Sequence, residues 1–123
     1  MAKLLVVDDE PGYRESLQWM LSACNHEVEI AGDCAGCITT AQRFHPDVLI
    51  VDYMLKDHCS GLDLAQSLSG SLPYMKTIVM TGYPCEELRT HAAQFFAVLE
   101  KPFFPDELCL LIEQAMQRPH GLA

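Results

Sequence analysis

The chain has 123 residues, of which 50% are hydrophobic and 20% are charged, a balance typical of a single globular domain. Its formal net charge of -9 disfavours direct binding to nucleic acid, because phosphate backbones attract Lys and Arg. Lys3 is followed by only four apolar residues, and no apolar run approaches the roughly 20 residues of a membrane span. We therefore expect a cytoplasmic chain with no membrane association.

Short apolar runs alternate along the chain with segments of helical spacing. The runs predict strands at residues 3–7, 27–30, 48–52, 75–80 and 95–99. The segments between them predict helices from residue 11 to about 24, and at 34–44, 62–68, 86–93 and 106–116. This alternation predicts an α/β fold of three layers, a parallel sheet with helices on both faces. We expect one domain at residues 1–118, with 119–123 as a tail or the start of a linker.

Polar side chains follow four of the five predicted strands. Asp8 and Asp9 follow the first strand, and Asp52 ends the third. Thr81 follows the fourth strand and Lys101 the fifth. The carboxyl ends of parallel strands meet at one edge of a sheet, so we expect these groups to share one crevice. A single aspartate at a strand end is usually a turn or cap residue. The presence of compatible polar groups at four strand ends is what indicates a site.

The chemistry of these groups suits phosphoryl transfer. Carboxylates gathered together stay ionised only beside positive charge, and oxygen ligands with room for water suit Mg²⁺. The ammonium of Lys101 can neutralise Asp52 or hold an oxyanion, and Thr81 offers a hydroxyl donor. Asp52 would be the nucleophile, because carboxylates can form acyl phosphates.

The motifs around these positions resemble the receiver domain of two-component response regulators, from residue 3 to about 116. The resemblance implies a doubly wound, five-stranded, flavodoxin-like sheet with strand order 2-1-3-4-5. It also implies a phosphorelay signalling protein. It rests on five segments in this order: residues 4–11 (LLVVDDEP), 46–54 (PDVLIVDYM), 61–64 (GLDL), 80–83 (MTGY) and 101–103 (KPF).

The resemblance assigns expected roles to single residues. Asp52 would accept a phosphoryl group from a sensor histidine kinase or a phosphotransfer protein, with self-phosphorylation and self-dephosphorylation rather than conventional turnover. The Lys101–Pro102 bond is expected to be cis. Asp9, Asp52 and the backbone carbonyl of Met54 would bind Mg²⁺, with Asp8 acting through water. Thr81 and Lys101 would sense the phosphoryl group.

The partners follow from the same resemblance. Besides the kinase, we expect an output domain or a target protein that responds to phosphorylation. A homodimer is a further expectation, formed through the face of the fourth helix, fifth strand and fifth helix.

Two departures from the family pattern bear on signalling. Lys56 stands where the family usually has proline, and the segment from Asp52 to Gly61 is one residue longer than usual. Val98 stands where an aromatic switch residue is expected, three places before Lys101. These departures keep open an alternative, a degenerate receiver that serves as a constitutive protein-docking module.

The six cysteines are expected to be mostly free thiols that pack as small hydrophobic groups. Cys34 and Cys37 form a C-x-x-C motif, but at the start of the second predicted helix rather than after a first strand. Cys59 and Cys85 lie on predicted loops at the active edge, so a bridge between them, or a metal shared with His58, is a further possibility.

Overall fold

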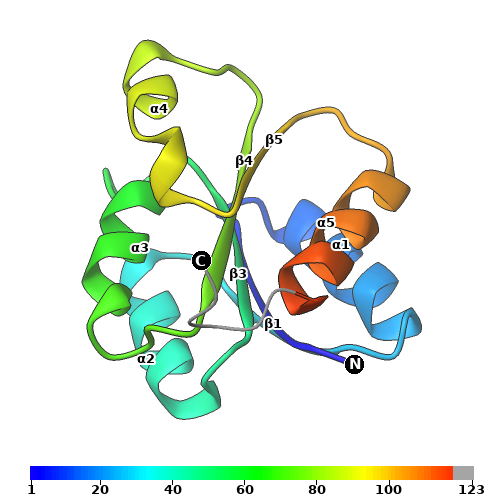
Figure 1. The fold of residues 1–123 in the computed structure, drawn as a ribbon. Helices are drawn as coiled ribbons and strands as arrows, with labels where there is room; N and C mark the ends of the chain where they lie inside the picture. The colour runs from blue at the N-terminus through cyan, green and yellow to red at the C-terminus, as the bar shows by residue number, and fades with distance from the viewer. Residues whose placement is uncertain (118–123) are drawn as a thin grey trace.

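Five strands alternate with helices in the computed structural model, which describes residues 1–117 (Figure 1). The tail predicted for 119–123 and the predicted domain boundary at residue 118 lie outside the described residues. The strands are β1 (Lys3–Val7), β2 (Glu27–Ala31), β3 (Val48–Asp52), β4 (Lys76–Thr81) and β5 (Ala97–Glu100). The helices are α1 (Pro11–Ala23), α2 (Cys34–Phe44), α3 (Gly61–Ser69), α4 (Glu86–Thr90), the 3-10 helix η1 (Ala92–Gln94) and α5 (Pro105–Gln117).

The strands form one sheet in the order β2-β1-β3-β4-β5, and every pairing is parallel. The predicted fold class and strand order are therefore confirmed. β1 and β3 are neighbours near the centre, with Val7 opposite Val51. Because of this register, the residues that follow β1 emerge beside the end of β3.

Helices cover both faces of the sheet, with α1 and α5 on one side and α2, α3 and α4 on the other (Figure 1). Alternate residues of each buried strand pack against the helices on opposite faces of the sheet. Leu4 and Val6 of β1 pack with Leu21 and Ile112 of the α1–α5 layer. Their neighbours Leu5 and Val7, together with Leu49 and Val51 of β3, pack with Leu64 and Leu68 of α3. Burial on both faces explains why β1 and β3 read as continuous apolar runs.

Some predicted element ends were wrong. The predicted helix at 86–93 is only five residues long, and its polar segment continues as η1 after His91. Leu88 is the one buried side chain of α4, so little packing supports a longer helix. The fifth strand begins at Ala97 rather than residue 95, and Phe95 precedes it.

None of the helices within residues 1–117 has the length and apolar character that crossing a membrane would require.

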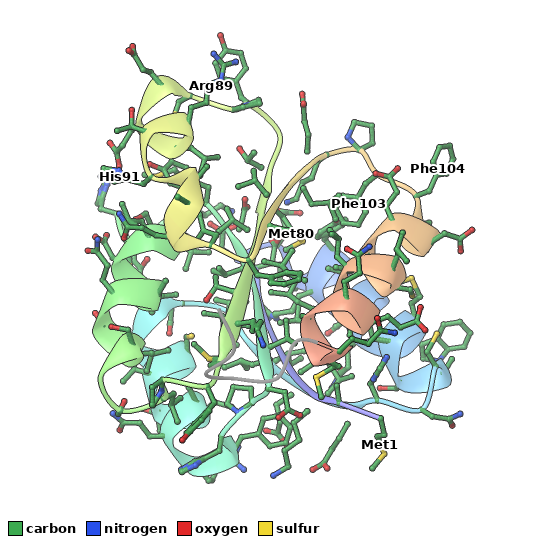
Figure 2. The ribbon with its side chains drawn as sticks, in the orientation of Figure 1. Met1, Met80, Arg89, His91, Phe103 and Phe104 are labelled. Atoms are coloured by element: carbon green, nitrogen blue, oxygen red, sulfur yellow. A yellow bond between two sulfur atoms is a disulfide. The ribbon has the colours of Figure 1, made fainter. Side chains whose placement is uncertain are left out.

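The two aromatic residues after the cis Lys101–Pro102 bond differ in burial. Phe103 packs against the α1–α5 core, whereas Phe104 is 76% exposed and projects away from the start of α5 (Figure 2). The cis bond itself agrees with the prediction from the family resemblance.

Candidate functional site

Three carboxylates meet where β1 and β3 end. One oxygen from each of Asp8, Asp9 and Asp52 lies within 4.8 Å of the others. Asp8 is almost completely buried, at 1% exposure, whereas Asp9 and Asp52 are partly exposed. The neighbouring positions of β1 and β3 in the sheet bring these residues together, although more than 40 residues separate them in the chain.

The ammonium of Lys101 lies against this acidic group. Its Nζ is 3.2 Å from Oδ2 of Asp8 and 3.5 Å from Oδ2 of Asp52. It also lies 4.5 Å from the ring centroid of Tyr13 on α1, a cation–π contact that the sequence did not reveal. Lys101 reaches this position because its amide donates to the Thr81 carbonyl, 2.7 Å away, which places the end of β5 beside the end of β4.

Burial and charge act against each other at this site. Burial raises the pKa of Asp52 above its ordinary 3.8; the nearby Lys101 opposes this rise, and Asp8 and Asp9 add to it. Burial lowers the pKa of Lys101, but the carboxylates of Asp52 and Asp8 outweigh it and leave that pKa above its ordinary value. The described side chains therefore neutralise the acidic group incompletely, which favours the binding of a further positive charge.

Asp8 is held in place by two contacts at the start of α1. Its Oδ1 accepts a hydrogen bond from the amide of Glu10, 2.8 Å away. Its backbone carbonyl accepts one from Nη1 of Arg14, 2.6 Å away. The first contact is a turn that aspartate commonly forms with the residue two places on, so sequence could have suggested it. The Arg14 contact has no comparable sequence signal.

Asp9 is oriented by the loop that follows β3. Its Oδ2 accepts a hydrogen bond from the amide of Lys56, 2.7 Å away. The loop is folded on itself, because the Leu55 amide donates to the Cys59 carbonyl at 2.9 Å and Met54 forms a bridge with Ser60. A proline at position 56 would have no N–H to donate. The departure at Lys56 thus adds a backbone contact to the acidic group.

Thr81 and Asp52 line the same open pocket, of about 380 Å³. The Thr81 hydroxyl accepts from the Tyr83 amide at 3.2 Å and donates to the Tyr83 carbonyl at 3.1 Å. The structure thus brings Thr81 to the predicted edge with its hydroxyl engaged by backbone rather than by the carboxylates. Met54, whose carbonyl was predicted as a ligand, lines this pocket too.

Tyr53, the residue after Asp52, connects the site to α4. Its side chain is 5% exposed, and its hydroxyl donates to Oε1 of Glu87 at 2.6 Å. Burial and the hydrogen bond with Glu87 raise the pKa of Tyr53. Val98 on β5 is 37% exposed and presents no ring or hydroxyl to these groups.

Most of the cysteines are free thiols, as expected, but one pair that was not anticipated is bonded. Cys34 and Cys59 form a disulfide, with their Cα atoms 6.3 Å apart, so the possible bridge between Cys59 and Cys85 does not form. Cys37 of the C-x-x-C motif is a free thiol, fully buried, and burial raises its pKa to about 12. Cys37 belongs to the core cluster against which Cys34 packs, and its thiol is not part of the disulfide. Within residues 1–117 the free thiols are those of Cys24, Cys37, Cys85 and Cys109.

Comparison with known proteins shows the family of the chain. The family described as response regulator receiver domain matches residues 4–113. The chain is 32% identical over 117 residues to the probable transcriptional regulatory protein TcrX of Mycobacterium tuberculosis, covering 94% of this chain and 50% of that protein. It is 30% identical over 118 residues to response regulator MprA of Mycobacterium leprae, covering 94% and 51%. The chain thus spans about half the length of these relatives.

Solved structures show the same fold. A response regulator receiver domain protein from Clostridium thermocellum superposes with a TM-score of 0.87 at 25% identity, covering 96% of both chains. Response regulator TrrA of Thermotoga maritima, in complex with Mg²⁺ and BeF, superposes with a TM-score of 0.82 at 26% identity, covering 94% of this chain and 99% of that one.

Proposed function

The chain belongs to the response regulator receiver domain family, and from this we propose that it is a phosphorylation-dependent switch whose phosphoryl acceptor is Asp52. The donor would be a sensor histidine kinase or a phosphotransfer protein. The observation that carries the proposal is the gathering of Asp52 with Asp8, Asp9 and Lys101 at one sheet edge.

The acidic group fits Mg²⁺. Its three carboxylates carry more negative charge than Lys101 balances, and hard oxygen ligands are those that Mg²⁺ prefers. Asp9, Asp52 and the backbone carbonyl of Met54 would hold the ion, with Asp8 acting through water. When bound, Mg²⁺ supplies positive charge for the carboxylates and the phosphoryl oxygens. The Mg²⁺–BeF complex of the related Thermotoga maritima regulator supports this assignment.

The reaction we propose is an in-line transfer to Asp52. A carboxylate oxygen of Asp52 attacks phosphorus, the bond from phosphorus to the donor histidine nitrogen breaks, and an acyl phosphate forms. Lys101 is already 3.5 Å from Asp52 and can balance the charge that the phosphoryl group brings. Thr81 lines the same pocket, and its hydroxyl is a suitable donor to a phosphoryl oxygen.

We propose two routes from the site to α4. If the Thr81 hydroxyl turns to a phosphoryl oxygen, it gives up its contacts with Tyr83 in the loop before α4. A movement of Asp52 would also displace its neighbour Tyr53, whose hydroxyl donates a hydrogen bond to Glu87 of α4. These contacts would replace the aromatic switch that Val98 cannot supply. Nearly complete switching requires roughly 5 kcal/mol of differential stabilisation between the two states.

The partners of the chain follow from its relatives, of whose length it spans about half. Those relatives carry the names of transcriptional or response regulators, which supports an output domain or a target protein as the recipient of the signal. The exposed surface of α4, β5 and α5 is the proposed homodimer face. We propose that the chain acts in the cytoplasm and that this domain itself binds neither nucleic acid nor membrane.

Chemical phosphorylation tests the assignment of Asp52. The protein is incubated with acetyl phosphate and Mg²⁺, and intact-mass spectrometry measures the addition of one phosphoryl group. We expect labelling of the wild type and of Asp106→Asn, a control at an exposed carboxylate in the first turn of α5. Asp52→Asn should remain unlabelled. Equal labelling of Asp52→Asn would show that another residue is the acceptor.

A second candidate function is a docking module that does not depend on phosphorylation. It is favoured by Val98 in place of the aromatic switch and by the engagement of the Thr81 hydroxyl with Tyr83. Titration calorimetry with Mg²⁺, and size-exclusion chromatography with and without beryllofluoride, distinguish the two functions. A docking module would bind no Mg²⁺ at millimolar concentration, and beryllofluoride would not change its elution.

A further inference from the structure

A disulfide ties the loop after β3 to the start of α2. Cys34 is the first residue of α2, and Cys59 lies in the loop between β3 and α3, 25 residues further along the chain. Both residues are partly buried against the α2–α3 core, not enclosed within it. A bond at such a position can be reached by a small thiol in solution.

A second contact joins the same two segments. Oδ2 of Asp57 accepts a hydrogen bond from the Cys34 amide, 3.2 Å away. The carboxylate therefore lies at the N-terminus of α2, where the unpaired N–H groups of a helix stabilise negative charge. The loop is thus held at α2 by one covalent bond and one hydrogen bond.

The same loop contacts the acidic group at its other side. The Lys56 amide donates to Oδ2 of Asp9, and the Leu55 amide donates to the carbonyl of Cys59 itself. Met54, the proposed source of a carbonyl ligand, lies two residues before Lys56. One cysteine of the disulfide is therefore joined by a single backbone hydrogen bond to the segment that orients Asp9.

We propose that Cys34 and Cys59 form a reversible redox site that exchanges with a low-molecular-weight thiol such as glutathione, and that its oxidised form raises the Mg²⁺ affinity of the acidic group. The bond restrains the loop that presents the Lys56 amide to Asp9. Groups that orient a metal ligand typically change metal affinity by about 10- to 100-fold. The statement about Mg²⁺ rests on the proposed function, whereas the statement about thiol exchange stands without it.

Reduction of the disulfide consumes two molecules of glutathione. One glutathione thiolate attacks the sulfur of Cys59, the bond between the two protein sulfurs breaks, and Cys34 leaves as a thiolate at the N-terminus of α2. A second glutathione thiolate attacks the mixed disulfide and releases oxidised glutathione. The protein gains two electrons and two protons, and ends with two thiols. Oxidised glutathione drives the reverse reaction.

The test uses the wild-type chain at a series of ratios of reduced to oxidised glutathione. Differential alkylation and mass spectrometry measure the fraction of Cys34 joined to Cys59, and titration calorimetry measures Mg²⁺ affinity in the fully reduced and fully oxidised samples. We expect the bond to form and break within the series. Reduction should weaken Mg²⁺ binding by about tenfold.

Two double variants separate this bond from other thiols. Cys34→Ser/Cys59→Ser should show the weak Mg²⁺ affinity of the reduced wild type under every condition. Cys24→Ser/Cys109→Ser, which removes the thiol pair that interacts between the end of α1 and α5, should keep the redox dependence. If the two thiol states of the wild type bind Mg²⁺ equally, the coupling is wrong.

Other results separate this inference from the proposed function. A bond that resists every glutathione mixture, or never forms, overturns the redox site whatever the fate of Asp52. Redox-dependent Mg²⁺ binding in a protein that acetyl phosphate does not label would support the redox site and overturn the proposed function. A protein that binds no Mg²⁺ in either thiol state overturns both the coupling and the metal assignment, while alkylation still decides the exchange.

Discussion

Replacing Asp52 by asparagine should stabilise the metal-free protein at neutral pH. Asp52 is attracted by Lys101 at 3.5 Å and repelled by Asp8 and Asp9, whose oxygens lie no more than 4.8 Å away. At an effective dielectric constant of 20 the attraction is about 5 kcal/mol, and each repulsion is about 3.5 kcal/mol or more. Repulsion therefore exceeds attraction by about 2 kcal/mol, which screening reduces to about 1 kcal/mol because the Asp52 side chain is 21% exposed.

Lys101 keeps a partner in this variant, because Asp8 remains 3.2 Å from its ammonium. The charge of Lys101 therefore stays paired, and a gain of about 1 kcal/mol corresponds to a rise in Tm of about 4 °C for a domain of this size. Thermal unfolding followed by circular dichroism in the presence of a chelator measures the change. Glu15→Gln, at an exposed carboxylate of α1, is the control and should leave Tm within error of the wild type.

The gain should depend on pH. The folded pKa of Asp52 is raised above 3.8, so folding favours its protonated form. The stability that protonated Asp52 contributes is fully present below pH 3.8 and is lost as pH rises through the folded pKa. The advantage of Asp52→Asn should therefore be largest at neutral pH and vanish as pH falls toward 3.8. A lower Tm for the variant at pH 7 without Mg²⁺ would refute the reasoning, because it would mean that the pairing with Lys101 dominates.

Two further changes test the loop after β3. Lys56→Pro removes the N–H that donates to Asp9 and should weaken Mg²⁺ binding by about tenfold in calorimetry, whereas Lys56→Ala keeps that N–H and should bind like the wild type. Equal affinities for the two variants would contradict the role of the amide. Cys34→Ser/Cys59→Ser removes a crosslink between residues 25 apart and should lower the free energy of unfolding by about 3.5 kcal/mol in urea under oxidising conditions. Reduced wild-type protein should unfold at nearly the same urea concentration as this variant; a large difference would show that the serines, not the loss of the bond, cause the change.

The order of apolar runs and polar ends allowed the fold and the position of the site to be predicted. Continuous apolar runs at β1 and β3 mark strands buried on both faces, and parallel strands must deliver their following residues to one edge. Asp52 could be singled out for this reason. The ends of α4 and β5 were predicted less well, because packing from a single buried residue, Leu88, does not produce a strong periodic pattern.

The contacts that tune the site could not be predicted from the sequence. The Lys56 amide reaches Asp9, and the Thr81 hydroxyl bonds to Tyr83, through backbone N–H and C=O groups that nearly every residue carries. Such contacts depend on the path of a loop and leave no residue type as a signal. Lys101 likewise lies slightly closer to Asp8 than to Asp52, which only the packing of three strand ends decides.

The sequence by itself determined the chemistry available at the sheet edge: which strands form, and which carboxylates, hydroxyl and ammonium follow them. Local patterns of apolar and polar residues contain that information. Only the tertiary structure decided which cysteines pair. Cys37 is three residues from Cys34 but faces the core, whereas Cys59 is brought to Cys34 by the loop that returns from β3. A disulfide depends on distance in space, which the folded arrangement of α2 and that loop sets and spacing along the chain does not.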